Sequence, residues 1–145
     1  TKKNSTVTFK GRVPKWELLR FYSENEIDLF STVSKWDGIP VSIMGAMSFG
    51  IPTVATNVGG VAELVINDEN GILLSTDPRP QEVADALLKI AQLPDAEYLQ
   101  LRSKALETWG TFYSATINYP IFCDRIFALA DDKPTETSGV LRKVG

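Results

Sequence analysis

Histidine is absent from this chain of 145 residues, and cysteine occurs once, at Cys123. Without histidine the chain has no Ser-His-Asp triad and no imidazole to act as a general base or zinc ligand. A single cysteine forms no internal disulfide, fits a reducing compartment, and is expected to be a buried thiol. The sequence therefore excludes histidine-dependent hydrolases, most zinc proteins and disulfide-stabilised domains.

Long apolar runs and an excess of positive charge are also absent. No run approaches the roughly 20 residues that a membrane helix needs. The net charge of −3, from 15 basic and 18 acidic residues, argues against a nucleic-acid partner. The polar start, TKKNST, has neither Met nor an apolar signal region, so the chain is expected to begin inside a larger protein.

What is present is an alternation of short apolar runs and amphipathic segments, which predicts parallel strands joined by helices. We predict an α/β fold: a partial Rossmann-like parallel sheet of about four strands flanked by helices, over residues 1–130, with a polar tail at 131–145. The predicted strands are 7–9, 27–33, 51–56 and 72–74, and the predicted helices are 16–25, 40–50, 61–66, 80–92, 95–109 and 120–130.

The segment from Asp37 to Val41 is the first candidate for a binding site. It follows a predicted strand and leads into a helix whose first amides have no partner within the helix. Gly38 allows a ligand close to the backbone, and Asp37 is an acceptor for hydroxyl groups. The alternative is that Asp37 only stabilises the positive end of the helix.

Two further turns follow predicted strands, at 57–60 and at 10–13. Gly59 and Gly60 either cradle an anion with their amides or make only a tight turn. Around Gly11 the flat base of a nucleotide has room to lie on the backbone, and Lys10 or Arg12 could reach a phosphate. The alternative is a solvated loop that carries two surface cations. Because parallel strands end at one edge of a sheet, the turns at 37–41 and 57–60 are expected to converge on one crevice.

Three tryptophans accompany these elements. Trp16 and Trp109 lie on apolar faces of predicted helices, so both are expected to pack in the core. Trp36 stands beside Asp37, where it either stacks on a sugar or covers the loop.

The order of these motifs resembles that of family-four glycosyltransferases, retaining enzymes of the GT-B fold with two Rossmann-like domains. The resemblance covers Val7 to about Ala91 and rests on the segments VTFKGRV, IDLFSTVS, DGIPVSIM, AMSFGIPTVAT, NVGG and NGILLS.

The resemblance implies that this chain is the C-terminal, nucleotide-sugar-binding part of such an enzyme. The first of the family's two donor-binding glutamates corresponds to Asp37, and the second corresponds to Gly45, which cannot contact a ribose. The sugar and diphosphate would meet the amides of Gly38, Ile39 and Val41. The base would lie beside Gly11, Arg12 and Val13, and Gly59 and Gly60 would line the floor of the cleft.

The implied reaction is glycosyl transfer with retention, from a nucleoside diphosphate sugar, without metal or other cofactor. The acceptor-binding domain and the basic pair that grips the diphosphate would lie outside this chain, so independent turnover is not expected. The implied location is the cytoplasm, and any contact with a membrane would be made by the part of the enzyme that lies outside this chain. The alternative is a non-catalytic remnant or interaction module, which Gly45 favours; a nucleotide-sugar epimerase fits the motif order less well.

Overall fold

The computed structural model describes residues 6–131, so the predicted tail lies outside the described residues except for residue 131. Three parallel strands form one sheet in the order β1 (Phe30–Thr32), β2 (Thr53–Thr56) and β3 (Gly71–Leu74). Phe30 lies opposite Thr53, and Thr53 lies opposite Gly71. The predicted α/β class with a parallel sheet is confirmed.

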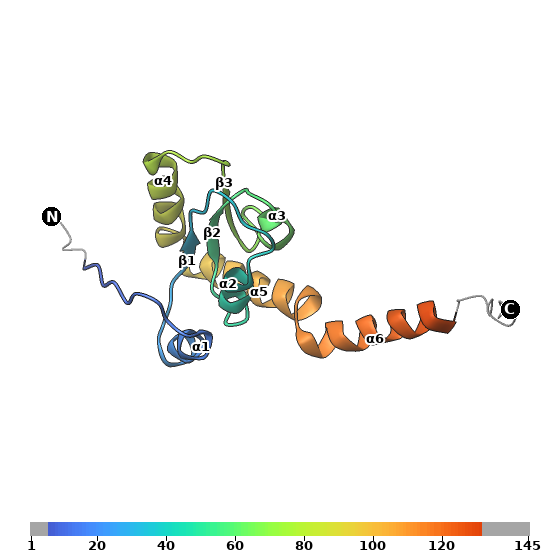
Figure 1. Cartoon of the computed structure of the whole chain (residues 1–145). Helices are drawn as coiled ribbons and strands as arrows, with labels where there is room; N and C mark the ends of the chain where they lie inside the picture. Colours follow the sequence, from blue (N-terminus) through green and yellow to red (C-terminus); the bar gives the residue numbers. More distant parts are fainter. Residues whose placement is uncertain (1–5, 132–145) are drawn as a thin grey trace, which may run out of the picture.

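Helices pack on both faces of this sheet (Figure 1). Val54 of β2 packs on one face with residues of α4 and α5, whereas the next residue, Ala55, packs on the other face with α2 and α3. Buried Ala46 of α2 shares a third cluster with Tyr22 of α1. The helices are α1 (Lys15–Glu24), α2 (Val41–Met47), α3 (Val61–Leu64), α4 (Pro80–Ala91), α5 (Asp95–Phe112) and α6 (Ala115–Asp131).

The predicted strand at 7–9 is wrong, so the described residues hold three strands where about four were expected. Phe9 is 94% exposed and lies outside the sheet. The strand predicted at 27–33 is observed only at Phe30–Thr32, and its neighbour Val33 as well as Ser31 within it are exposed. Within residues 6–131, β1 pairs with β2 alone, so it is an edge strand and lacks the second neighbour that would cover it.

Two predictions of burial are wrong. Trp16 is 65% exposed, and the guanidinium group of Arg20 lies 6.0 Å from the centre of its ring. Cys123 is an exposed thiol on α6. Trp109, in contrast, packs against the core as expected. Apolar spacing located the helices correctly, but it could not show which helical faces have a neighbour to cover them.

The helices α5 and α6 are longer than predicted, whereas α2 and α3 end two or three residues earlier than predicted. α5 continues through Gly110 to Phe112, and α6 begins at Ala115, with Pro120 inside its early turns. A Cβ atom at Gly110 would meet nothing within 4 Å. No contact requires a glycine at this position, which weakens α5 without ending it. None of the helices among the described residues is long and apolar enough to cross a membrane.

Candidate functional site

The turn after β1 and the turn after β2 are in direct contact at the carboxyl edge of the sheet. The backbone N–H of Gly60 donates to the carbonyl oxygen of Gly38 at 2.9 Å. Deeper in, the hydroxyl of Thr56 donates to the carbonyl oxygen of Ser34 at 2.6 Å. The predicted convergence of these two turns is therefore confirmed.

The glycine pair in the second turn is explained by the approach of the two backbones. Gly59 has a φ of +53°, and a Cβ atom there would overlap the carbonyl oxygen of Asp37. A Cβ atom on Gly60 would stand 2.6 Å from Cγ1 of Ile39. Both glycines are thus needed for close packing, whether or not a ligand lies over them.

Asp37 is half-buried in the first turn, next to the contact between the turns. Its Oδ1 accepts the backbone N–H of Gly38 at 2.9 Å. Within residues 6–131 no protein group donates to its other oxygen, Oδ2. The Gly38 amide, expected to be free for a ligand, thus has a partner, whereas Oδ2 remains an acceptor for a ligand hydroxyl.

Apolar side chains around this turn are exposed rather than folded onto it. Trp36 is 85% exposed, and Ile39 and Val41 are also exposed. A ring so exposed does not cover the loop, which removes one of the two alternatives for Trp36. A flat apolar surface beside an open carboxylate oxygen suits a sugar ring.

A cavity of about 240 Å³ lies between α1 and α2, next to the Asp37 turn. It brings together three of the sequence-predicted positions, Val13, Val41 and Gly45. The remaining lining residues are Lys15, Leu18, Leu19, Tyr22 and Ser42. Burial raises the pKa of Tyr22 above its ordinary value.

Sequence reasoning missed Lys15 and Ser42 in this cavity. Both lie in the first turn of a helix, Lys15 in α1 and Ser42 in α2. The proline immediately before each helix was the sequence signal that could have located these first turns. Gly11 and Arg12 are exposed, with Gly11 at a φ of +65°. Neither residue lines the cavity that Val13 enters.

Gly45 has no evident structural reason to be glycine. A Cβ atom at this position would meet only Cδ2 of Leu19, at 3.6 Å, which is an ordinary contact. The residue lies in the interior of α2, where glycine costs about 1 kcal/mol relative to alanine. Nothing in the structure explains the glycine, and a longer side chain would extend from a wall of the cavity.

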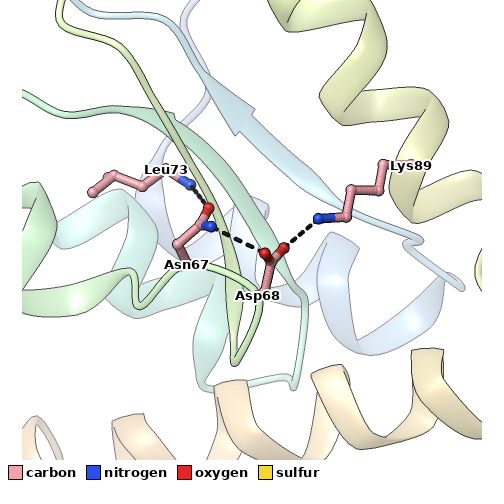
Figure 2. Close-up of polar contacts among 4 residues, drawn as sticks. All are labelled: Asn67, Asp68, Leu73 and Lys89. Carbon is pink, nitrogen blue, oxygen red and sulfur yellow. Dashed lines mark hydrogen bonds and ion pairs between the residues drawn. The ribbon is translucent and has the colours of Figure 1, made fainter.

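A larger cavity, of about 720 Å³, lies at the opposite edge of the sheet, between α4, α5 and the turn before β3. Two of its charged groups, Lys89 and Asp68, form an ion pair. Lys89 Nζ lies 2.6 Å from Asp68 Oδ1, and Asn67 joins Asp68 to the backbone N–H of Leu73 (Figure 2). These bonds fix the turn before β3, so the smaller cavity, which Val41 of the first turn lines, is the better candidate site.

The fold is that of a glycosyltransferase domain of the GT-B type. The C-terminal domain of a glycosyl transferase group 1 family protein from Francisella tularensis matches with a TM-score of 0.61 at 21% identity, over 74% of this chain and 53% of that one. Sucrose-phosphate synthase from Thermosynechococcus elongatus matches with a TM-score of 0.64 at 23% identity. The match covers 84% of this chain and 30% of the synthase.

The chain belongs to the family Glycosyl transferases group 1, whose profile matches residues 1–107. The O-antigen biosynthesis glycosyltransferase WbnH of Escherichia coli is 32% identical over 96 residues, which are 66% of this chain and 26% of that protein. The amylovoran biosynthesis glycosyltransferase AmsK of Erwinia amylovora is 32% identical over 90 residues, 59% of this chain and 22% of its own length. The chain thus spans about a quarter of these relatives.

Proposed function

We propose that this chain is the part of a retaining glycosyltransferase that binds a nucleoside diphosphate sugar. The observation that carries the proposal is the contact of the two carboxyl-edge turns, beside a cavity that extends from Val13 to Gly45. Asp37 would accept hydroxyls of the donor sugar through Oδ2. The backbone from Gly38 to Val41 would border the diphosphate, and Gly59 and Gly60 would form the floor of the cleft.

The nucleoside would enter the cavity between α1 and α2. Its apolar wall of Val13, Leu18 and Val41 suits the face of a base. Lys15, at the same cavity, would lie near a phosphate or a ribose oxygen. Gly11 and Arg12 would lie at the outer border of the base, since the structure places them outside the cavity.

Transfer itself would need the part of the relatives that this chain does not span. The oxygen of an acceptor hydroxyl would bond to the anomeric carbon as the bond from that carbon to the diphosphate breaks on the same face, and the hydroxyl proton would pass to the leaving diphosphate. Cations and backbone amides would stabilise the charge on the leaving diphosphate, without a metal ion. The enzyme would act in glycan biosynthesis on the cytoplasmic side of a membrane.

The second candidate is a non-catalytic module that keeps the fold without turnover. Gly45 favours it, because the family's second donor-binding carboxylate is absent there. A charge-assisted hydrogen bond contributes about 1.5–3 kcal/mol, so its loss would weaken donor binding roughly 10- to 100-fold. The space beside Gly45 makes the restoring variant Gly45→Glu sterically feasible.

Calorimetric titration with uridine, guanosine and adenosine diphosphate sugars separates the two candidates. The variants are Gly45→Glu, Asp37→Asn and, as a matched control, Asp85→Asn. Asp85 is an exposed carboxylate on α4, which packs on the face of the sheet opposite α2 and α3. We expect Gly45→Glu to tighten binding of one donor class at least tenfold. Asp37→Asn should weaken that binding about tenfold, and Asp85→Asn should leave it unchanged.

The opposite results favour the module. If neither the wild type nor Gly45→Glu binds any donor at millimolar concentration, donor binding has been lost. If Asp37→Asn lowers the melting temperature and the affinity in parallel, its effect is structural and the role assigned to Asp37 is wrong.

A further inference from the structure

The turn that leads into β3 is closed by the side chain of Asn70, which is fully buried. Its Oδ1 accepts the backbone N–H of Ile66 at 2.8 Å. Its Nδ2 donates to the carbonyl oxygen of Leu64 at 2.9 Å and to the hydroxyl oxygen of Thr108, on α5, at 3.1 Å. Leu64 is the last residue of α3, so one amide side chain joins the end of α3 to α5.

The residue after Asn70 has to be glycine. A Cβ atom on Gly71 would overlap the carbonyl oxygen of Thr53, its partner on β2, so the two strands approach here only because one of them lacks a side chain. The fold therefore requires each residue of this Asn-Gly dipeptide for a different reason. The dipeptide occurs once in the chain.

Asn-Gly is the dipeptide most prone to deamidation, because glycine leaves the following backbone nitrogen unshielded and the backbone flexible. The nitrogen of Gly71 bonds to Cγ of Asn70 as the bond from Cγ to Nδ2 breaks. The proton of the attacking nitrogen leaves with the amide nitrogen as ammonia, and a five-membered cyclic imide forms. Water then adds to one imide carbonyl carbon, and the bond from that carbon to the Gly71 nitrogen breaks. The product is aspartate or isoaspartate.

The folded structure holds the Asn70 side chain away from this reaction. Its amide group is bound to residues 64 and 66, which precede it, and to α5, whereas the attacking nitrogen belongs to the residue that follows. Attack on Cγ requires these hydrogen bonds to break and the turn to open. The rate therefore follows the population of the opened turn.

The products do not restore the closed turn. In aspartate an oxygen replaces Nδ2 and faces the carbonyl oxygen of Leu64, with no proton to donate to it at neutral pH. Thr108 does not compensate, because its hydroxyl already donates to the carbonyl oxygen of Lys104 at 2.8 Å. A buried carboxylate against a carbonyl oxygen is strongly unfavourable. Isoaspartate also lengthens the backbone immediately before β3.

We propose that Asn70 is a deamidation site that converts this domain irreversibly to a loosened form, and that the closed turn before β3 controls the rate. The loosened form lacks the hydrogen bond that holds the end of α3. Because α3 begins beside Gly60, whose N–H donates to Gly38, the loss extends toward the carboxyl edge of the sheet. The inference rests on the fold alone and is independent of donor binding.

Mass spectrometry of the full chain, folded and in guanidinium chloride at mildly alkaline pH, tests the proposal. Each deamidation raises the mass by about 1 Da, and peptide mapping locates it. We expect Asn70 to react at least tenfold more slowly in the folded chain than in the unfolded chain. The internal control is Asn67, exposed in the same turn but followed by Asp68 (Figure 2), which should react more slowly than Asn70 in guanidinium chloride.

Two variants test the assigned hydrogen bond. Thr108→Val removes one acceptor of Asn70 Nδ2 with little change of shape, and it should raise the rate in the folded chain severalfold. Thr111→Val, at an exposed position of the same helix, is the matched control and should leave the rate unchanged.

A third variant, Asn70→Asp, reproduces one product. It should lower the denaturant midpoint and accelerate hydrogen exchange at residues 61–66. The matched control is Asn25→Asp, because Asn25 Nδ2 also donates to a carbonyl oxygen at the end of a helix, at 2.9 Å, but at an exposed position. Asn25→Asp should have a smaller effect on the midpoint.

Equal rates for Asn70 in the folded and unfolded chains would overturn control by the turn, as would equal acceleration by Thr108→Val and Thr111→Val. Absence of deamidation at Asn70 in guanidinium chloride would overturn the site itself. An Asn70→Asp variant as stable as the wild type would show that the product closes the turn again, which contradicts the loosened form. A variant Asn70→Asp that does not fold supports it, and the rates measured on the wild type test the site without that variant.

Discussion

The backbone N–H of Gly60 donates to the carbonyl oxygen of Gly38, and this bond of 2.9 Å joins the turns after β1 and β2. Next to it, Gly59 lies against the carbonyl group of Asp37 so closely that no side chain fits between them. The position of the half-buried Asp37 carboxylate thus depends on two glycines that are more than twenty residues later in the chain. Stability and the shape of the candidate site are coupled at this point.

Gly59→Ala should destabilise the fold by roughly 2–4 kcal/mol, because it combines an unfavourable positive φ with overpacking against the Asp37 carbonyl. Urea unfolding monitored by tryptophan fluorescence measures the change. Gly38→Ala is the matched control, since a Cβ atom there meets nothing within 4 Å. Equal losses in the two variants would show that the turn contact has no special energetic role.

Gly45→Ala should stabilise the protein by about 0.5–1 kcal/mol, because the position is inside α2 and the new methyl group makes one ordinary contact with Leu19. The same urea assay applies. Gly110→Ala provides the comparison, as a helical glycine with open space around it, and should gain a similar amount. A stability loss confined to Gly45→Ala would mean that the packing of α1 on α2 excludes any side chain at this position.

Glu82 should contribute stability that is lost in acid. The backbone N–H and then the hydroxyl of Ser75 donate to its carboxylate and hold its pKa below the ordinary value of 4.5. A carboxyl group with a lowered pKa stabilises the folded state above the unfolded pKa, and this contribution disappears as the pH falls through the folded pKa. Glu82→Gln should therefore be less stable than the wild type at pH 7, with the difference disappearing as the pH falls through the lowered pKa of Glu82.

Glu97→Gln is a matched control for that experiment, because Glu82 and Glu97 occupy the same third position of their helices, α4 and α5. Both variants lose the favourable interaction with the helix dipole, whereas Glu82→Gln alone weakens the contact with Ser75. Urea unfolding at pH 7, 5 and 3 separates the two effects. Identical pH profiles would refute the role assigned to Ser75.

Local patterns were sufficient to predict most of the elements. Pro40 and Gly50 bracket α2, and the apolar runs at 51–56 and 72–74 contain β2 and β3. Chain order then placed the turns at 37–41 and 57–60 at one edge, because consecutive parallel strands joined by helices end on the same side. The convergence of the two turns follows from that topology, whereas the hydrogen bond between Gly60 and Gly38 was not predicted.

The predictions of burial were wrong where burial depends on a neighbouring element that the local sequence does not reveal. Phe9, Trp16 and Cys123 lie in segments whose apolar spacing indicates burial, yet all three are exposed, because the described residues provide no surface that covers them. The partner of the Gly38 amide, the carboxylate of Asp37, was also not foreseen. Lys15 reaches the cavity only because α1 packs beside α2, a tertiary contact that no local pattern encodes.

The central claim is that a nucleoside diphosphate binds where the two turns meet. The most direct test is to titrate the full chain with uridine diphosphate and with guanosine diphosphate to millimolar concentration and to record ¹⁵N–¹H correlation spectra. The account predicts that one of them shifts the amides at 11–13, 37–41 and 57–60, whereas those of Lys89 and Leu93, at the larger cavity, stay in place. Shifts confined to the cavity between α4 and α5, or no shifts with either nucleotide, would contradict it.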